Sequence, residues 1–163
     1  MSTSDDLKEA FAGESQANRK YLAFAKKADA EGYAQVARLF RAAADAETVH
    51  AHAHLRAMDG VKGTADNLTE AIGGETHEFT SMYPPMIERA RAEGNNAAVM
   101  SFENANAVEQ IHAGLYKKAL DNLGNNAEVD YWVCQVCGNT VEGEPPDQCP
   151  ICSSPKTAFN KID

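Results

Sequence analysis

Cysteine is absent from the first 133 positions of this 163-residue chain, and aromatic residues make up only 7% of it. Hydrophobic residues nevertheless reach 44%, and alanine is prominent among them. A shortage of aromatic residues combined with much alanine favours closely packed helices over a β-sandwich. We therefore expect an all-α fold for most of the chain, with the cysteine-containing end as a separate small domain.

The chain also lacks a basic excess and a long apolar run. Its formal net charge of -9 argues against nucleic acid or an anionic membrane as a partner. No stretch approaches the length needed to span a bilayer. Residues 1–6 contain neither a basic region nor an apolar segment, so we expect no secretory signal and a cytoplasmic protein.

All four cysteines lie in the last thirty residues, as two Cys-x-x-Cys pairs with eleven residues between them. Because we expect no export signal, this pattern predicts a reduced metal site rather than a disulfide framework. Two such pairs can close a tetrahedral sulfur site, which suits either zinc or a single iron. The predicted ligands are Cys134, Cys137, Cys149 and Cys152.

Helical periodicity divides the rest of the chain into four segments. The pattern predicts helices over residues 7–30, 33–58 and 97–123, and one that starts with Asp66 or Asn67 as its N-cap and runs to about residue 93. These boundaries predict a four-helix bundle over 1–124, a polar linker over 125–130 and a small metal domain over 131–163.

The two predicted helical hairpins repeat each other at an offset of 62 residues. Glu47 recurs as Glu109, His50 as His112, and Tyr21 as Tyr83, but Glu14 recurs as Glu75 at an offset of 61. Pro84 and Pro85 follow this one-residue slip, so we expect a kink or a π-bulge in the third helix to absorb the extra residue.

Each hairpin contains a Glu-x-x-His pair about thirty residues after another glutamate. Residues three apart project from nearly the same face of a helix, so each pair presents an oxygen and a nitrogen ligand together. The repeat also brings the glutamates of each antiparallel hairpin to one level. Two such sets form the ligands of a di-metal four-helix bundle. The predicted ligands are Glu14, Glu47, His50, Glu75, Glu78, Glu109 and His112.

Oxygen-rich ligands with a minority of imidazoles suit two adjacent iron ions, and manganese or zinc could also load there. His52 and His77 point away from the predicted site, and we expect His54 to pack beside it rather than bind metal. Tyr21 and Tyr83 lie two turns from Glu14 and Glu75, so either packing or a hydrogen bond to a ligand carboxylate would explain them.

The connection between the second and third helices is short for a bundle in which these two helices run parallel. It must cover about 28 Å along the bundle, whereas nine steps from Met58 to Asn67 reach at most about 30 Å when fully extended. We therefore hypothesise a domain-swapped homodimer, in which the first hairpin of one chain pairs with the second hairpin of the other. Early fraying of the second helix is the competing explanation.

These residues together resemble the rubrerythrin family over essentially the whole chain. The resemblance rests on Gly-Glu-Ser-Gln-Ala at 13–17, Gly-Glu-Thr-His-Glu-Phe at 74–79, Met-Tyr-Pro at 82–84, both Glu-x-x-His pairs and the four cysteines. It implies a ferritin-like bundle followed by a rubredoxin-like domain in which four cysteines hold one iron. It also implies a non-haem di-iron peroxidase that reduces hydrogen peroxide to water and contributes to oxidative-stress protection.

The resemblance also implies a role for each site residue. Glu14 and Glu47 would hold one iron, for which Glu78 and His50 exchange with redox state. Glu75, Glu109 and His112 would hold the other iron, Glu47 and Glu109 can bridge, and both tyrosines would lie just outside the ligands. Electrons would reach the cysteine-bound iron from an external rubredoxin or NAD(P)H-dependent reductase.

Two other functions are compatible with parts of the sequence. A ferroxidase or iron-handling protein would share the bundle but would have no evident use for a sulfur-ligated electron donor. A structural zinc-ribbon module would account for the cysteines but would leave the seven aligned carboxylate and imidazole ligands unexplained. Metal content separates these functions, because the peroxidase needs iron in both places.

Overall fold

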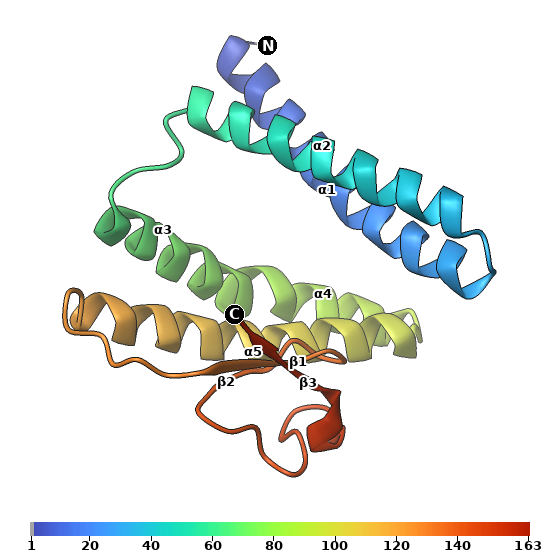
Figure 1. The fold of residues 1–163 in the computed structure, drawn as a ribbon. Helices are drawn as coiled ribbons and strands as arrows, with labels where there is room; N and C mark the ends of the chain where they lie inside the picture. The colour runs from blue at the N-terminus through green and yellow to red at the C-terminus, as the bar shows by residue number, and fades with distance from the viewer. Residues whose placement is uncertain (1) are drawn as a thin grey trace. The chain divides into compact units, whose positions relative to one another are not determined.

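The structure is a computed structural model that describes residues 2–163. It divides into two compact units, Met1–Lys62 and Gly63–Asp163. The first unit is one antiparallel helical hairpin, α1 (Thr3–Ala30) and α2 (Ala34–Ala57), drawn from blue to green in Figure 1. The second unit contains the other hairpin and the cysteine domain.

In the second unit, α3 (Thr64–His77), the π-helical segment η1 (Glu78–Met82) and α4 (Tyr83–Ala92) follow one another without a break. This composite helix packs along α5 (Asn96–Asp121), as Figure 1 shows. The π-helical segment lies between Glu75 and Tyr83, where the repeat offset changes from 61 to 62. A π turn accommodates one extra residue, so the expected π-bulge is confirmed and explains the slip in the repeat.

Two predicted helix starts were wrong. The first helix begins at Thr3 rather than residue 7, because Ser2 and Asp5 form a capping box that satisfies the earlier amides. The third begins at Thr64 with Gly63 as its N-cap, so neither Asp66 nor Asn67 is the cap. Asp66 instead lies in the first turn, where its charge favours the helix dipole. The second helix continues to Ala57 and does not fray early.

Both hairpins turn in the same way. Gly32 and Gly94 follow the first helix of each pair with φ of +84° and +68°, a conformation that glycine adopts readily. The backbone N–H of Tyr33 donates to Ala28 O at 2.8 Å, and that of Asn95 donates to Ala90 O at 2.9 Å. These repeated bonds close the preceding helix ends in a Schellman-type arrangement, so each turn fixes the register of its hairpin.

Small residues allow the helices of the first hairpin to approach closely. The buried positions of α2 are Ala37, Ala44 and Ala51, which are spaced seven residues apart and form one narrow seam. The helix α1 packs along α2, and its own buried residues include Ala25 and Ala28. The second hairpin buries larger side chains, and its most enclosed apolar residues are Ile87, Ala90, Val108 and Ala113.

After α5 the chain runs without regular structure to a three-stranded antiparallel sheet of order β2-β1-β3. Its strands are β1 (Tyr131–Cys134), β2 (Thr140–Glu142) and β3 (Phe159–Ile162), with a 3-10 turn, η2 (Lys156–Ala158), before the last strand. Cys134, Cys149 and Phe159 form its small buried core. None of the helices among residues 2–163 has the length and hydrophobicity that a membrane crossing needs.

Candidate metal centres

The first hairpin brings Glu14 of α1 together with Glu47 and His50 of α2. His50 Nδ1 lies 2.9 Å from Glu47 Oε2 and 3.8 Å from Glu14 Oε1. One ligand atom from each of the three residues lies within 4.8 Å of the other two. We call this cluster the first half-site. Its glutamates are partly buried, whereas the His50 side chain is 55% exposed.

The second hairpin repeats this geometry with Glu75 of α3 and Glu109 and His112 of α5. His112 Nδ1 lies 2.9 Å from Glu109 Oε2 and 3.7 Å from Glu75 Oε1. We call this cluster the second half-site. Its histidine is only 27% exposed, about half the value for His50.

The electrostatics of the second half-site favour a bound cation. Burial raises the pKa of the Glu75 carboxyl, and the charge of Glu109 raises it further, against an opposing effect of His112. Two partly buried carboxylates side by side repel each other and lose hydration. A divalent or trivalent cation offsets both costs, and carboxylate oxygens with one imidazole nitrogen per cluster suit iron.

Glu78 is placed differently from the other six predicted ligands. It is the first residue of η1 and belongs to neither half-site cluster within the described part of the chain. Glu78 interacts electrostatically with Tyr83. Burial raises the pKa of the Tyr83 phenol, and the charges of Glu78, Glu109 and Glu75 raise it further. The Tyr83 hydroxyl therefore keeps its proton and lies in the carboxylate environment of the second unit.

The other predicted tyrosine has a different environment. The ring centroid of Tyr21 lies 6.3 Å from that of Phe24 and 6.2 Å from that of Phe40, within an aromatic cluster of the first hairpin. This favours a packing role. His52, His54 and His77 belong to none of the potential metal clusters found among residues 2–163.

A hydrogen-bonded Asn18 supports the first half-site, and the sequence patterns did not identify it. The amide Nδ2 of Asn18 donates to Ala44 O at 2.7 Å and to Thr48 Oγ1 at 2.8 Å. Asn18 lies one turn after Glu14, and Thr48 follows Glu47, so the bonds fix the two ligand-bearing helices relative to each other. Asn18 lies four residues after Glu14 and therefore on the same face of the helix, which is the sequence feature that could have identified it.

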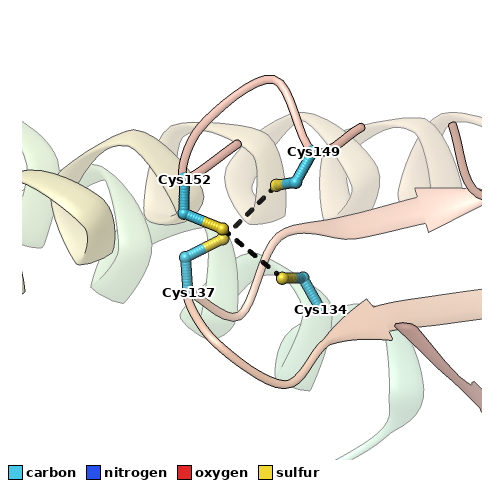
Figure 2. Close-up of side chains that lie close together, drawn as sticks. All are labelled: Cys134, Cys137, Cys149 and Cys152. Atoms are coloured by element: carbon cyan, nitrogen blue, oxygen red, sulfur yellow. Dashed lines mark hydrogen bonds between the residues drawn. The ribbon is translucent and has the colours of Figure 1, made fainter. Parts of the chain in front are cut away.

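The four cysteine sulfurs converge in the small domain, as Figure 2 shows. Cys134 Sγ lies 3.6 Å from Cys152 Sγ, and Cys137 Sγ lies 3.6 Å from Cys149 Sγ. A tetrahedral ion with metal–sulfur bonds of about 2.3 Å places its sulfurs about 3.8 Å apart. The spacing therefore fits one tetrahedral metal ion.

Hydrogen bonds to the cysteine sulfurs affect their protonation. Burial raises the pKa of Cys152, but the hydroxyl and backbone N–H of Ser154 oppose this effect and help lower the pKa to about 6. The buried Asn139 also contributes, since its Nδ2 lies 3.6 Å from Cys149 Sγ. Such bonds favour the thiolate form that binds metal and influence the reduction potential of a bound iron.

The cysteine domain also contacts α5 directly. Thr140 Oγ1 lies 2.9 Å from His112 Nε2, and the ammonium group of Lys118 pairs with the Glu142 carboxylate. Residues two apart on a strand share a face, so Thr140 and Glu142 present one side of β2 to the helix. Within the second unit, this strand therefore contacts a predicted ligand of the second half-site.

The helical hairpins, the two carboxylate–histidine clusters and the sulfur site define a ferritin-like di-iron protein with a rubredoxin-like domain. A family model described as Rubrerythrin matches residues 5–120, and one described as the rubrerythrin rubredoxin-like domain matches residues 132–160. The chain belongs to the rubrerythrin family.

The similarity to individual members of the family extends over nearly the whole chain. Nigerythrin of Nitratidesulfovibrio vulgaris is 38% identical over 97% of this chain and 85% of its own length, and Rubrerythrin-2 of Clostridium acetobutylicum is 36% identical over 96% and 95%. A solved structure of nigerythrin in a partially reduced state gives a TM-score of 0.61 at 36% identity, covering 99% of this chain and 87% of that one.

Proposed function

We propose that this protein is a non-haem di-iron peroxidase that reduces hydrogen peroxide to water and so protects against oxidative stress. The observation that supports this most is the presence, in one chain, of two carboxylate–histidine half-sites and a four-cysteine centre whose domain contacts α5. A ferroxidase or iron-handling protein has no evident use for that centre.

The proposed reaction is H2O2 + 2 e⁻ + 2 H⁺ → 2 H2O, in which the O–O bond is cleaved and both oxygens leave as water. Two bound irons would supply the electron pair, and the iron of the four-cysteine site would replace the electrons one at a time. An external rubredoxin or an NAD(P)H-dependent reductase is the proposed source of these electrons.

The proposed iron ligands are the seven residues identified from the sequence. Glu14 and Glu47 would hold one metal, and Glu75, Glu109 and His112 would hold the other, with Glu47 and Glu109 available to both. Glu78 and His50 would serve alternately as ligands of the metal held by Glu14 and Glu47. The sulfur ligands are Cys134, Cys137, Cys149 and Cys152.

Tyr83 is the proposed proton-holding group beside the site. Its raised pKa keeps the Oη proton in place near neutral pH, so the phenol can donate a hydrogen bond to a ligand carboxylate or to an oxygen of the bound peroxide. Tyr21 is proposed to lie just outside the ligands, with a smaller effect.

We propose the domain division 1–124, 125–130 and 131–163, a cytoplasmic location and a domain-swapped homodimer. The helix bounds support the swap: Glu47 lies about 15 Å before the end of α2 at Ala57, and Glu75 about 17 Å after the start of α3 at Thr64. In a ferritin-like bundle these helices are joined by a long crossover. Seven steps between them reach at most about 25 Å, less than the sum of those distances.

We therefore propose that a completed bundle combines the first hairpin of one chain with the second hairpin of another. Sedimentation of the metal-loaded protein tests this directly. The swap requires a dimer that holds four bundle metals, and a monomer that holds two bundle metals contradicts it.

Stopped-flow oxidation of the anaerobically reduced, iron-loaded protein tests the peroxidase. Hydrogen peroxide should oxidise the bundle irons faster than oxygen does, and Glu78→Ala should remove most of that preference. Glu70→Ala on α3 lies outside the clusters and is the matched control. Equal rates with peroxide and oxygen, or wild-type behaviour of Glu78→Ala, would contradict the assignment. Zinc alone in the cysteine site, with no iron in the bundle, would favour a structural module.

A further inference from the structure

The hydroxyl of Thr140 lies between the two metal centres of the second unit. Thr140 Oγ1 is 2.9 Å from His112 Nε2 on one side and donates to Gly138 O at 3.1 Å on the other. Gly138 directly follows the sulfur ligand Cys137. A continuous hydrogen-bonded path therefore joins the imidazole of the second half-site to the cysteine knuckle.

Thr140 matches the tautomer that metal binding through Nδ1 would require of His112. In that tautomer Nε2 carries the hydrogen and donates it to Thr140 Oγ1, and the single hydroxyl hydrogen of Thr140 is donated to Gly138 O. The lone pair of Nδ1 is then available to a metal beside Glu109 Oε2, 2.9 Å away, and Glu75 Oε1, 3.7 Å away.

We propose that Thr140 is a positioning residue for the second half-site and couples metal binding there to the folded, metal-loaded cysteine domain. The proposal rests on the function of His112 as a ligand. A hydrogen bond to the second nitrogen of a ligand histidine fixes its tautomer and ring orientation and raises its basicity. In this chain that bond comes from another domain.

The coupling arises because the cysteine knuckle holds Thr140 in place. The backbone N–H of Gly138 donates to Cys134 O at 2.8 Å, and Thr140 pairs with Val133 in the sheet. Loss of the ion from the four sulfurs loosens this turn and with it the partner of His112. Such coupling is reciprocal, so a filled second half-site also stabilises the metal in the cysteine domain.

The first half-site allows His50 to be compared with His112 within the same chain. His50 has the same 2.9 Å contact to its own Glu-x-x-His glutamate. Among residues 2–163, however, no hydrogen-bond partner is found for His50 Nε2, and its side chain is 55% exposed. The internal repeat therefore reproduces the ligands but not the bond from Thr140, which belongs to the second half-site.

Titration of the bundle with Co²⁺ tests the proposal, using full-length protein whose four-cysteine site already holds zinc. Thr140→Val keeps the shape but removes the hydroxyl, and should weaken one class of bundle sites about 10- to 100-fold. Thr140→Ser restores the hydroxyl and should bind like wild type. Lys118→Ala removes a different contact between the domain and α5, and should leave Co²⁺ affinity within about twofold.

Nuclear magnetic resonance of the fully zinc-loaded protein supplies a readout independent of both affinity and peroxidase activity. The Nε2–H of His112 should exchange slowly with solvent in wild type and Thr140→Ser, and rapidly in Thr140→Val. Equal protection in all three, or unchanged Co²⁺ affinity in Thr140→Val, would overturn the proposal. A Thr140→Val protein that does not fold is replaced by Thr140→Ala, for which the same results are expected.

Emptying the sulfur site tests the coupling itself. The double variant Cys134→Ser/Cys149→Ser should lower Co²⁺ affinity at the same class of bundle sites as Thr140→Val does. Adding Thr140→Val to that background should then have little further effect, because coupled changes are not additive. Fully additive effects would overturn the coupling. These experiments measure metal binding and hydrogen exchange rather than peroxidase activity. Their results therefore test the role of Thr140 even if the peroxidase assignment fails.

Discussion

The two half-sites have nearly the same ligand geometry but different surroundings. Each histidine lies 2.9 Å from the glutamate three residues before it, and 3.8 or 3.7 Å from the glutamate on the other helix of its hairpin. His50 is 55% exposed, whereas His112 is 27% exposed and is bonded through Nε2 to Thr140. The repeat thus preserves the ligands, and the cysteine domain makes the two copies unequal.

This inequality matches the roles proposed for the two histidines. A ligand that exchanges with Glu78 must be able to move, and among the described residues His50 has no bond like that from Thr140 to hold its ring. A ligand that stays on its metal benefits from a fixed orientation, which the Thr140 bond gives to His112. The bond from the cysteine domain is therefore a structural difference that would allow the two histidines to have different roles.

The largest predicted effect is the recovery of activity when two inactive variants, each damaged in a different half-site, are combined in one dimer. Glu47→Ala damages the first half-site and Glu109→Ala the second, so either homodimer should have almost no peroxidase activity. In a swapped dimer, a mixed pair of these variants contains one site with all its ligands. Co-refolding equal amounts should restore about a quarter of the wild-type activity, because about half of the dimers are mixed and each has one intact site of two.

Co-refolding two samples of the same variant is the control, and neither should recover activity. If the mixture also remains inactive although mixed dimers are present by mass spectrometry, each site is built from a single chain and the swap is wrong.

The second prediction compares the repeat-related tyrosines. Tyr83→Phe removes a phenol whose pKa is raised by burial and by the charges of Glu78, Glu109 and Glu75, so it should slow peroxide reduction roughly a hundredfold. Tyr21→Phe keeps the ring that packs with Phe24 and Phe40, and should stay close to wild type. Stopped-flow rates measure both, and equal losses would mean that the two tyrosines act alike.

The smallest predicted effects concern the two hairpin turns, which have the same conformation. Gly32→Ala and Gly94→Ala place a side chain at φ of +84° and +68°, and each should lower the free energy of unfolding by about 1 kcal/mol. Gly114→Ala lies in a helix with open space around its Cβ and should stabilise by about 0.5–1 kcal/mol. Denaturant titration of the zinc-loaded variants tests this, and markedly different losses at the two turns would show that they are not equivalent.

Much of this arrangement could be predicted because its signals are periodic. Helical spacing and the 62-residue offset predicted the hairpins, the clustered glutamates and histidines, and the irregularity now observed as η1. The bond between His112 and Thr140 could not be predicted, because the two residues are 28 positions apart and belong to different domains. No periodicity relates them, and their contact depends on how β2 packs against α5.

The predicted start of the third helix was wrong for a related reason. Asp66 is a good capping residue by type, but the chain begins the helix at Gly63, with an extended N-cap and no side-chain cap bond. Capping preference is worth only about 1 kcal/mol and is readily overridden by the tertiary packing of the helix.

Crystal structures of the iron-loaded protein in peroxide-oxidised and dithionite-reduced states would test the central comparison most directly. We predict that the iron held by Glu14 and Glu47 is ligated by Glu78 when oxidised and by His50 when reduced. His112 should keep both its iron and its hydrogen bond to Thr140 in the two states. Movement of His112, or a His50 that binds iron in neither state, would contradict the account.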